Sequence, residues 1–222
     1  MPFGIKLQGV AVEFDGHTAL SAVNLDLTSK SIAVIGANGS GKSTFARLLN
    51  GLVKPTSGTV AVNGETPNNS NAGFVFSNPD LQIIMPTVLE DIEFSISNEK
   101  LSKEEKRTRA LSALAFVGIQ ALQDSNCHSL SSGQKQLLAI ASAIVRKPDL
   151  LIADEPTTLL DLPNTKRITK LLHEIEVNQL VIVTHDLDLA ATCDEAIWFS
   201  EGKLKSVGKP KTVIAAYRKH FE

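Results

Sequence analysis

A glycine-rich segment at residues 36–43 has the residue types and spacing of a phosphate-binding loop. Its sequence, GANGSGKS, fits the pattern GxxxxGK followed by serine or threonine. Glycines allow successive backbone N–H groups to curl around a phosphate without clashes from Cβ atoms. The next residues, from Lys42 to about Asn50, are expected to form a helix whose positive end faces the same phosphate. Lys42 would neutralise phosphate oxygens, and the Ser43 hydroxyl would coordinate Mg²⁺.

Two adjacent acids, Asp154 and Glu155, follow the apolar run Leu150–Ala153. Side chains alternate along a strand, so the two carboxylates are expected to point in different directions. Asp154 would support the shell of a Mg²⁺ ion, and Glu155 would hold an attacking water as a general base. Alone, the pair fits a solvated loop as well as a site, but the phosphate-binding loop upstream favours the site.

Four short apolar runs predict the strands that position these groups. They do not alternate with polar residues, which is typical of parallel strands covered on both faces. Open α/β sheets bind their ligands at the carboxyl ends of such strands. The runs are residues 32–35, 74–76, 150–153 and 180–183.

The segments around this sheet have a different character. Residues 5–14 and 19–27 are predicted to be partly exposed strands separated by a turn at Asp15-Gly16, and residues 68–71 are predicted to be a polar loop.

Residues 78–146 are predicted to be an inserted helical subdomain. Ser102 and Glu105 have the spacing of a capping box, and Gly118 is expected to end the helix that follows. A second helix is predicted over residues 132–146, before Pro148.

The composition is that of a globular protein. Of 222 residues, 43% are hydrophobic and 21% are charged, with a net charge of −2. This balance excludes disordered and fibrous proteins and gives no basic excess for binding nucleic acid. Cys127 and Cys193 belong to no metal-binding motif and are expected to be reduced thiols. No signal-peptide pattern is present, and no apolar run nears the ~18 residues that span a bilayer, so any role at a membrane would require a partner.

Two more motifs accompany the phosphate-binding loop and the acidic pair. Leu130-Ser-Ser-Gly-Gln134 precedes the second predicted helix, and His185 follows the run at 180–183. With the phosphate-binding loop and the acidic pair, the sequence resembles the ATP-binding cassette ATPases over essentially the whole chain. The resemblance implies one nucleotide-binding domain over residues 1–222, of α/β fold. Its parts would be a P-loop NTPase core with a RecA-like sheet, an N-terminal antiparallel β subdomain and the helical insert. It also implies hydrolysis of ATP with Mg²⁺.

The resemblance assigns roles position by position. Lys42, Glu155 and His185 would be catalytic, and Ser43 and Asp154 would hold the metal. Phe14 would stack on adenine, although a role in the strand core fits it equally. The residues matched to ATP binding are Phe14, Gly36, Ala37, Asn38, Gly39, Ser40, Gly41, Lys42, Ser43 and Thr44.

Domains of this family work in pairs, here as a homodimer or with a paralogous ATPase. Asp161 would lie in the loop that links the two sites. The signature residues that would contact the ATP of the partner are Ser131, Ser132, Gly133 and Gln134.

The sequence departs from the family pattern at three places. Ser77 stands where glutamine is usual and is too short to reach a Mg²⁺-bound water in the same way. We therefore expect either weaker coupling between transport and metal geometry, or a water that fills the space left by the shorter side chain. Ser132 replaces a second glycine of the signature, and Thr158-Leu159 replace a small Ala-Gly pair. All three substitutions are compatible with the backbone conformation of their motifs, and we expect them at most to lower the rate of ATP hydrolysis.

The segment at 74–96, FVFSNPDLQIIMPTVLEDIEFSI, indicates the subtype. It resembles a stretch of energy-coupling-factor uptake systems, which are bacterial importers of vitamins, cobalt and nickel. The resemblance implies that Ser77, Leu81, Gln82 and Ile84 lie where the ATPase docks on an integral membrane coupling protein. For the apolar residues here, a place in the core is an equal alternative.

The same resemblance implies a separate substrate-capture subunit and a peripheral position on the cytoplasmic face of the bacterial inner membrane. The short C-terminus favours the single-ATPase type, with biotin preferred to a metal ion as cargo. Two alternatives remain, the ATPase of an ordinary importer or exporter and, less favoured, a soluble cassette protein, which usually carries tandem cassettes or basic patches. A non-catalytic regulator is disfavoured because Lys42, Asp154, Glu155 and His185 are all present.

Overall fold

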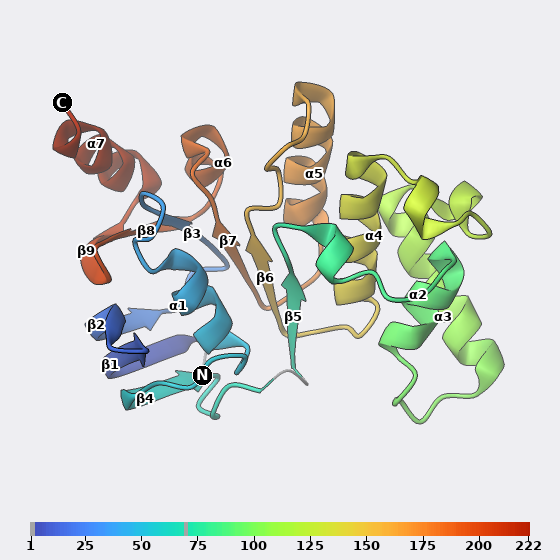
Figure 1. The fold of residues 1–222 in the computed structure, drawn as a ribbon, viewed down its shortest axis with the longest axis horizontal. Coiled ribbons are helices and arrows are strands. Elements are labelled where there is room, and N and C mark those ends of the chain that lie inside the picture. Colours follow the sequence, from blue (N-terminus) through green and yellow to red (C-terminus); the bar gives the residue numbers. More distant parts are fainter. Residues whose placement is uncertain (1–2, 69–70) are drawn as a thin grey trace.

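The computed structural model describes residues 3–68 and 71–222, which form two sheets with surrounding helices (Figure 1). Asn69 and Ser70 of the predicted polar loop lie outside the described residues. The smaller sheet is antiparallel, with the strand order β2-β1-β4. Its strands are β1 (Ile5–Phe14), β2 (His17–Leu27) and β4 (Ser57–Val62). The predicted N-terminal strands and the turn between them are therefore confirmed.

The larger sheet has six strands in the order β5-β6-β7-β3-β8-β9. All neighbours are parallel except β8 and β9. The four apolar runs predicted as strands all lie in the parallel part. The sequence did not predict β8 and β9; β9 alternates exposed and half-buried residues and has no apolar run. The strands are β3 (Ser31–Ile35), β5 (Ala72–Val75), β6 (Leu150–Asp154), β7 (Gln179–Val183), β8 (Glu195–Ser200) and β9 (Lys203–Gly208).

Both faces of the larger sheet are covered, which explains why its central strands are apolar throughout. In β3, Ala33 and Ile35 belong to the core cluster that includes the helices after β5. Ile32 and Val34, on the opposite face, belong to the cluster that includes the first helix and the smaller sheet. All four side chains are fully buried. Burial of both faces is the main favourable contribution to this layered α/β fold.

The helices α3 and α4 begin at the expected signals, and α4 ends two residues before the predicted position 146. Capping boxes at Ser102 and Ser131 begin α3 and α4, and Gly118, with a φ of 74°, ends α3. The helices are α1 (Lys42–Leu49), α2 (Val88–Ser95), α3 (Lys103–Val117), α4 (Ser132–Ile144), α5 (Leu162–Glu174), α6 (Leu187–Ala191) and α7 (Pro210–His220). Three short 3₁₀ turns accompany them, η1 (Pro79–Leu81), η2 (Gln120–Leu122) and η3 (Cys127–Ser129).

The chain between β5 and β6 forms α2, α3 and α4, which lie at the opposite end of the molecule from the smaller sheet (Figure 1). The two helices predicted in this segment are thus confirmed. Its status as a separate subdomain over residues 78–146 stays a prediction. Within the described residues, no helix combines the length and the apolar character needed to cross a bilayer.

Candidate active site

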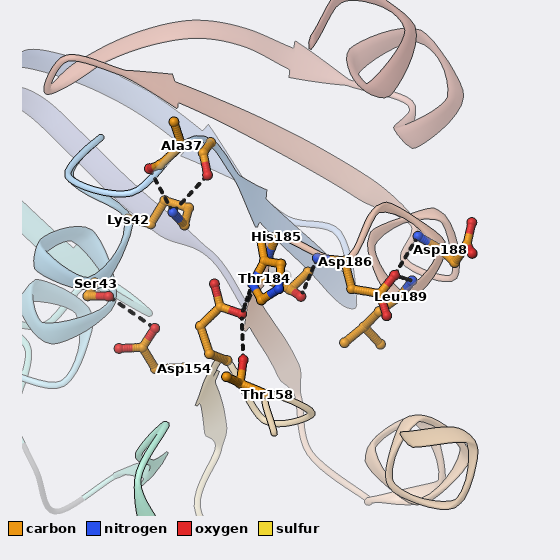
Figure 2. Close-up of polar contacts among 12 residues, drawn as sticks. Ala37, Lys42, Ser43, Asp154, Thr158, Thr184, His185, Asp186, Asp188 and Leu189 are labelled. Carbon is orange, nitrogen blue, oxygen red and sulfur yellow. Dashed lines mark hydrogen bonds and ion pairs between the residues drawn. The ribbon is translucent and has the colours of Figure 1, made fainter. Parts of the chain in front are cut away.

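The carboxyl ends of β3, β7 and β6 meet at one edge of the larger sheet. The three strands are parallel neighbours, and Val183 in β7 pairs with Val34 of β3 on one side and with Asp154 of β6 on the other. The phosphate-binding loop follows β3, the acidic pair ends β6, and His185 follows β7. Three predicted motifs therefore come together where open α/β sheets bind ligands (Figure 2).

The phosphate-binding loop leaves an anion-binding helix end open. Gly36 has a φ of 152°, and a Cβ atom there would collide with the carbonyl oxygen of Phe199 in β8. Gly41 is the N-cap of α1, and no side chain of the described residues caps this helix. The first turn also holds no acidic residue. The N–H groups of this turn and the positive end of the helix dipole can therefore bind a phosphate.

Lys42 is buried beside this loop, with 6% of its surface exposed. Its Nζ donates hydrogen bonds to the carbonyl oxygens of Gly36 at 2.8 Å and Ala37 at 3.0 Å (Figure 2). Burial lowers the pKa of this ammonium, while the charges of Glu155 and Asp154 act to raise it. Phosphate oxygens would form stronger, charge-assisted bonds with Lys42 than these carbonyls do.

Ser43 and Asp154 supply two neighbouring oxygens. Oδ1 of Asp154 accepts a hydrogen bond from Oγ of Ser43 at 3.1 Å. Burial raises the pKa of the Asp154 carboxyl, and the bond from Ser43 opposes this shift. Mg²⁺ commonly takes one or two protein oxygens and completes its octahedron with water and phosphate. Two adjacent ligands at ~2.1 Å from the ion lie about 3 Å apart, so this pair fits Mg²⁺.

That mode of binding needs no larger cluster of ligands. Across residues 3–68 and 71–222, no group of three or more His, Cys, Asp and Glu side chains is arranged to hold a metal ion. A Mg²⁺ ion here would therefore depend on phosphate oxygens for much of its coordination.

Glu155 points away from Asp154, toward His185. Its φ is 53°, a conformation that residues other than glycine rarely adopt, and its N–H donates to the carbonyl oxygen of Val183 at 2.8 Å. Oε2 of Glu155 lies 2.7 Å from Nδ1 of His185 and accepts a hydrogen bond from Oγ1 of Thr158 at 3.2 Å. Figure 2 labels both partners, His185 and Thr158, and marks the two contacts with dashed lines. Within the described residues, the contacts of the Glu155 carboxylate all use Oε2, so Oε1 is available to hold a water.

Replacing His185 with alanine is expected to lower the ATPase rate by about tenfold to a hundredfold, because Glu155 loses the contact that orients its carboxylate. Steady-state phosphate release, with ATP affinity measured separately, checks this. His173→Ala is the matched control, since His173 also has one side-chain contact, to Thr192 at 2.8 Å, but lies away from the acidic pair. Equal rates for His185→Ala and the parent chain would contradict the assigned contact.

The loop between β6 and α5 carries a strained and exposed leucine. Leu159 has a φ of 65° and is 91% exposed. On one side of it Thr158 bonds to Glu155, and on the other Asp161 caps α5 by accepting a hydrogen bond from the N–H of Asn164 at 2.9 Å. Because both flanks are fixed, Leu159 stays in a conformation that costs roughly 1 kcal/mol or more. The role of Asp161 in linking two sites stays a prediction.

Leu159→Gly is expected to raise the free energy of unfolding of the isolated chain by up to about 1 kcal/mol, because glycine adopts this conformation without strain. The thermal midpoint would rise by roughly 2–4 °C. Leu162→Ala is the control, since Leu162 is also exposed but lies in the first turn of α5. A clear loss of stability in Leu159→Gly would show that this leucine makes stabilising contacts that outweigh the strain.

The signature residues begin α4. Ser131 and Gln134 form a capping box, in which Oγ of Ser131 accepts from the N–H of Gln134 at 3.3 Å and Oε1 of Gln134 accepts from the N–H of Ser131 at 2.8 Å. A Cβ atom on Gly133 would lie 2.9 Å from the side chain of Asn164 in α5. In the described part of the chain, no hydrogen bond joins residues 131–134 to residues 36–43. Contact between this signature and a phosphate therefore stays a prediction.

Phe14 ends β1 and is about half exposed, so the alternative of a buried strand residue is wrong. The neighbouring strand is tied to the phosphate-binding loop through Gly202, which accepts from the N–H of Ser21 at 2.9 Å and donates to the carbonyl oxygen of Ser40 at 3.0 Å. Stacking of Phe14 on adenine stays a prediction.

The predicted docking residues divide into two groups. Leu81 and Ile84 are 74% and 67% exposed, and Ser77 is exposed as well. Gln82 is engaged inside the chain, where Oε1 accepts from the N–H of Phe76 at 3.3 Å and Nε2 donates to the carbonyl oxygen of Ala139 at 2.8 Å. Sequence reasoning missed these two bonds, because nothing in the motif shows which way an amide side chain turns.

A groove of about 650 Å³ lies beside this segment. Its walls come from β5, the residues just after α1, the loop before α2, the end of α2 with the residues that follow it, and the C-terminal end of α4. Both apolar and polar side chains line it. The lining includes Phe76, Ile84, Phe94, Ser97, Glu99 and Arg146.

Known proteins with similar sequences belong to one family. The family model described as "ABC transporter" matches residues 20–158. A "Biotin transport ATP-binding protein BioM" of Rhizobium etli is 41% identical over 219 residues, which cover 96% of this chain and 97% of that protein. An "Energy-coupling factor transporter ATP-binding protein EcfA1" of Mycoplasmopsis synoviae is 33% identical over 224 residues, covering 95% of this chain and 84% of that protein.

A solved structure has the same fold. It is cbiO1 from Clostridium perfringens, described as part of the ABC transporter complex cbiONQ. The TM-score is 0.87 at 35% sequence identity, and the match covers 97% of this chain and 92% of that one.

Proposed function

Because the chain belongs to the ABC transporter ATP-binding family, whose members hydrolyse ATP, we propose that it energises an importer of the energy-coupling-factor type. The single observation that carries the subtype is the segment at 77–96, which presents Leu81 and Ile84 to solvent beside the groove near the end of β5. Two exposed apolar side chains at a groove suit the insertion of an amphipathic helix of a membrane coupling protein. The names of the relatives from Rhizobium etli and Mycoplasmopsis synoviae support the same subtype.

The chemistry follows from the residues at the sheet edge. Lys42 and the N–H groups of α1 would bind the phosphates of ATP, and Ser43 and Asp154 would hold the Mg²⁺ that neutralises their charge. Glu155, oriented by His185 and Thr158, would hold the attacking water through its second oxygen. In-line attack on the γ-phosphorus then breaks its bond to the bridging oxygen and gives ADP and phosphate.

A second ABC subunit would complete each site. Ser131 and Gly133 stand at the N-terminus of α4, where the dipole favours an anion, yet they share no hydrogen bond with the phosphate-binding loop of the described chain. In a face-to-face dimer, the α4 terminus of one subunit would contact the γ-phosphate held by the other. Closure of the dimer on ATP would move α2–α4 and the docked membrane protein, and hydrolysis would reopen it.

We favour biotin as the cargo, with a transition-metal ion as the alternative. The 41% identity to the biotin transport protein of Rhizobium etli supports this choice. The cargo itself would bind a separate membrane subunit, so no residue of this chain would contact it. The chain would lie on the cytoplasmic face of the membrane, held there by its partner.

Capture from native membranes tests the proposed function. The tagged chain would be purified from its own cells in mild detergent, and the proteins recovered with it would be identified by mass spectrometry. We expect two small integral membrane proteins, one for coupling and one for substrate capture. Recovery of a pair of large permease domains would identify an ordinary transporter instead, and recovery of soluble proteins alone would reject a role at the membrane.

A further inference from the structure

A buried carboxylate holds the docking loop, residues 76–87 between β5 and α2, which carries the exposed side chains of Leu81 and Ile84. Asp91, in α2, is 2% exposed. Its Oδ1 accepts hydrogen bonds from the N–H groups of Ile84 at 2.8 Å and Met85 at 3.0 Å. Its Oδ2 accepts from Oγ of Ser142, in α4, at 3.1 Å. One side chain thus joins the loop before α2 to the C-terminal end of α4.

The charge of Asp91 is satisfied by hydrogen bonds alone. No ion pair found among the described residues includes it. The pKa of the buried Cys127 thiol is raised to about 11, first by burial and then by the nearby charges of Asp91 and Glu90. A buried carboxylate without a charged partner is costly unless it is hydrogen-bonded, and an apolar side chain in its place would leave the N–H groups of Ile84 and Met85 without this acceptor. The directional bonds of Asp91 are therefore its distinctive contribution.

Gln82 makes a second attachment of the same loop to α4. It connects the N–H of Phe76, just past β5, to the carbonyl oxygen of Ala139. Ala139 and Ser142 are three residues apart on α4, so they lie on one face of the helix. The loop that carries the exposed side chains of Leu81 and Ile84 is therefore attached through Gln82 and Asp91 to two positions of α4 that lie about one turn apart.

We propose that Asp91 is a positioning residue that makes the docking loop and α4 move as one body. Because α4 begins at the signature residues 131–134, a displacement of that end would be transmitted through Ser142 and Asp91 to Ile84. This inference rests on the proposed function, since it assumes that Leu81 and Ile84 contact a membrane partner. In this account Asp91 mechanically links two contacts. One is the contact of residues 131–134 with the second ABC subunit, and the other is the contact of Leu81 and Ile84 with the membrane partner.

Four variants of the full chain test this role by the membrane capture described above. Asp91→Ala removes all three bonds, and Ser142→Ala removes one. Asp91→Asn keeps an acceptor for both N–H groups and a donor for the Ser142 hydroxyl. Ile92→Ala is the matched control for stability, because Ile92 is fully buried in the same helix and makes no bond to the loop. The ATPase rate of each purified chain and the hydrogen exchange of the segment containing residues 84 and 85 are measured in parallel.

We expect Asp91→Ala to recover about tenfold less membrane protein per tagged chain than the parent and to exchange faster at residues 84 and 85. Its ATPase rate should stay within about twofold of the parent. Ser142→Ala should show a smaller loss, while Asp91→Asn should recover nearly the parental amount. Equal losses in Ile92→Ala or in Asp91→Asn would overturn the proposal, as would full recovery with Asp91→Ala. If the parent chain itself recovers no membrane protein, the proposed function fails and this inference falls with it.

Discussion

Glu155→Gln is expected to lower the steady-state ATPase rate by about a hundredfold to a thousandfold while ATP still binds. Glutamine has nearly the same shape and can still contact His185, but it cannot accept the proton of the attacking water. The structure gives this position an unusual backbone, with a φ of 53°, and two side-chain partners on one carboxylate oxygen. Such an arrangement fixes the second oxygen, where a water would be held.

Phosphate release at saturating ATP measures this effect. Glu176→Gln is the matched control, because Glu176 is exposed and precedes β7, at the opposite edge of the sheet from the acidic pair. ATP should also hold the Glu155→Gln chain in a stable dimer, which size-exclusion chromatography with light scattering would detect. Parental hydrolysis in this variant would revive the alternative of a nucleotide-binding regulator and would remove Glu155 from the mechanism.

Lys42→Ala is expected to weaken ATP binding by about a hundredfold and to abolish measurable hydrolysis at ordinary ATP concentrations. The ammonium is almost completely buried, and two carbonyl oxygens hold it at the phosphate-binding loop. Its removal would leave the phosphate charge uncompensated in a site with restricted access to solvent.

Calorimetric titration with ATP and Mg²⁺ measures the affinity. Lys170→Ala is the control, since the Lys170 side chain is largely exposed and its ion pair with Glu174 at 3.6 Å contributes little. Thermal unfolding of each variant without nucleotide separates a loss of binding from a loss of fold. Unchanged affinity in a folded Lys42→Ala chain would mean that the loop binds its anion through backbone groups alone.

The sequence predicts the central elements well because their signals are local. Continuous apolar runs mark β3, β5, β6 and β7, and the spacing of Ser102 and Glu105 marks the start of α3. The phosphate-binding loop and the acidic pair are also predictable, since glycine spacing and strand-end acids have direct chemical meaning. The meeting of these motifs at one edge then follows from the parallel sheet.

Other features depend on contacts between distant segments and could not be predicted. The strand β9 has no apolar run, and its place is set by antiparallel pairing with β8. The strand β8 has an apolar run at residues 196–199 that the sequence reasoning missed, and its place is set by pairing with β3. The bonds of Thr158 to Glu155, Gln82 to Ala139 and Asp91 to Ser142 depend on side-chain directions that follow only from packing. The orientation of the Phe14 side chain could not be predicted for the same reason, since an aromatic residue in a strand can face the core or the solvent.

Transport by the reconstituted complex tests the central claim most directly. The membrane proteins captured with the tagged chain would be placed in lipid vesicles together with the parent chain or the Glu155→Gln variant. Uptake of labelled biotin would be followed with and without ATP. The proposed function predicts ATP-dependent uptake with the parent chain and almost none with Glu155→Gln. ATP hydrolysis by the complex without uptake of biotin or of nickel or cobalt ions would contradict an importer of this type.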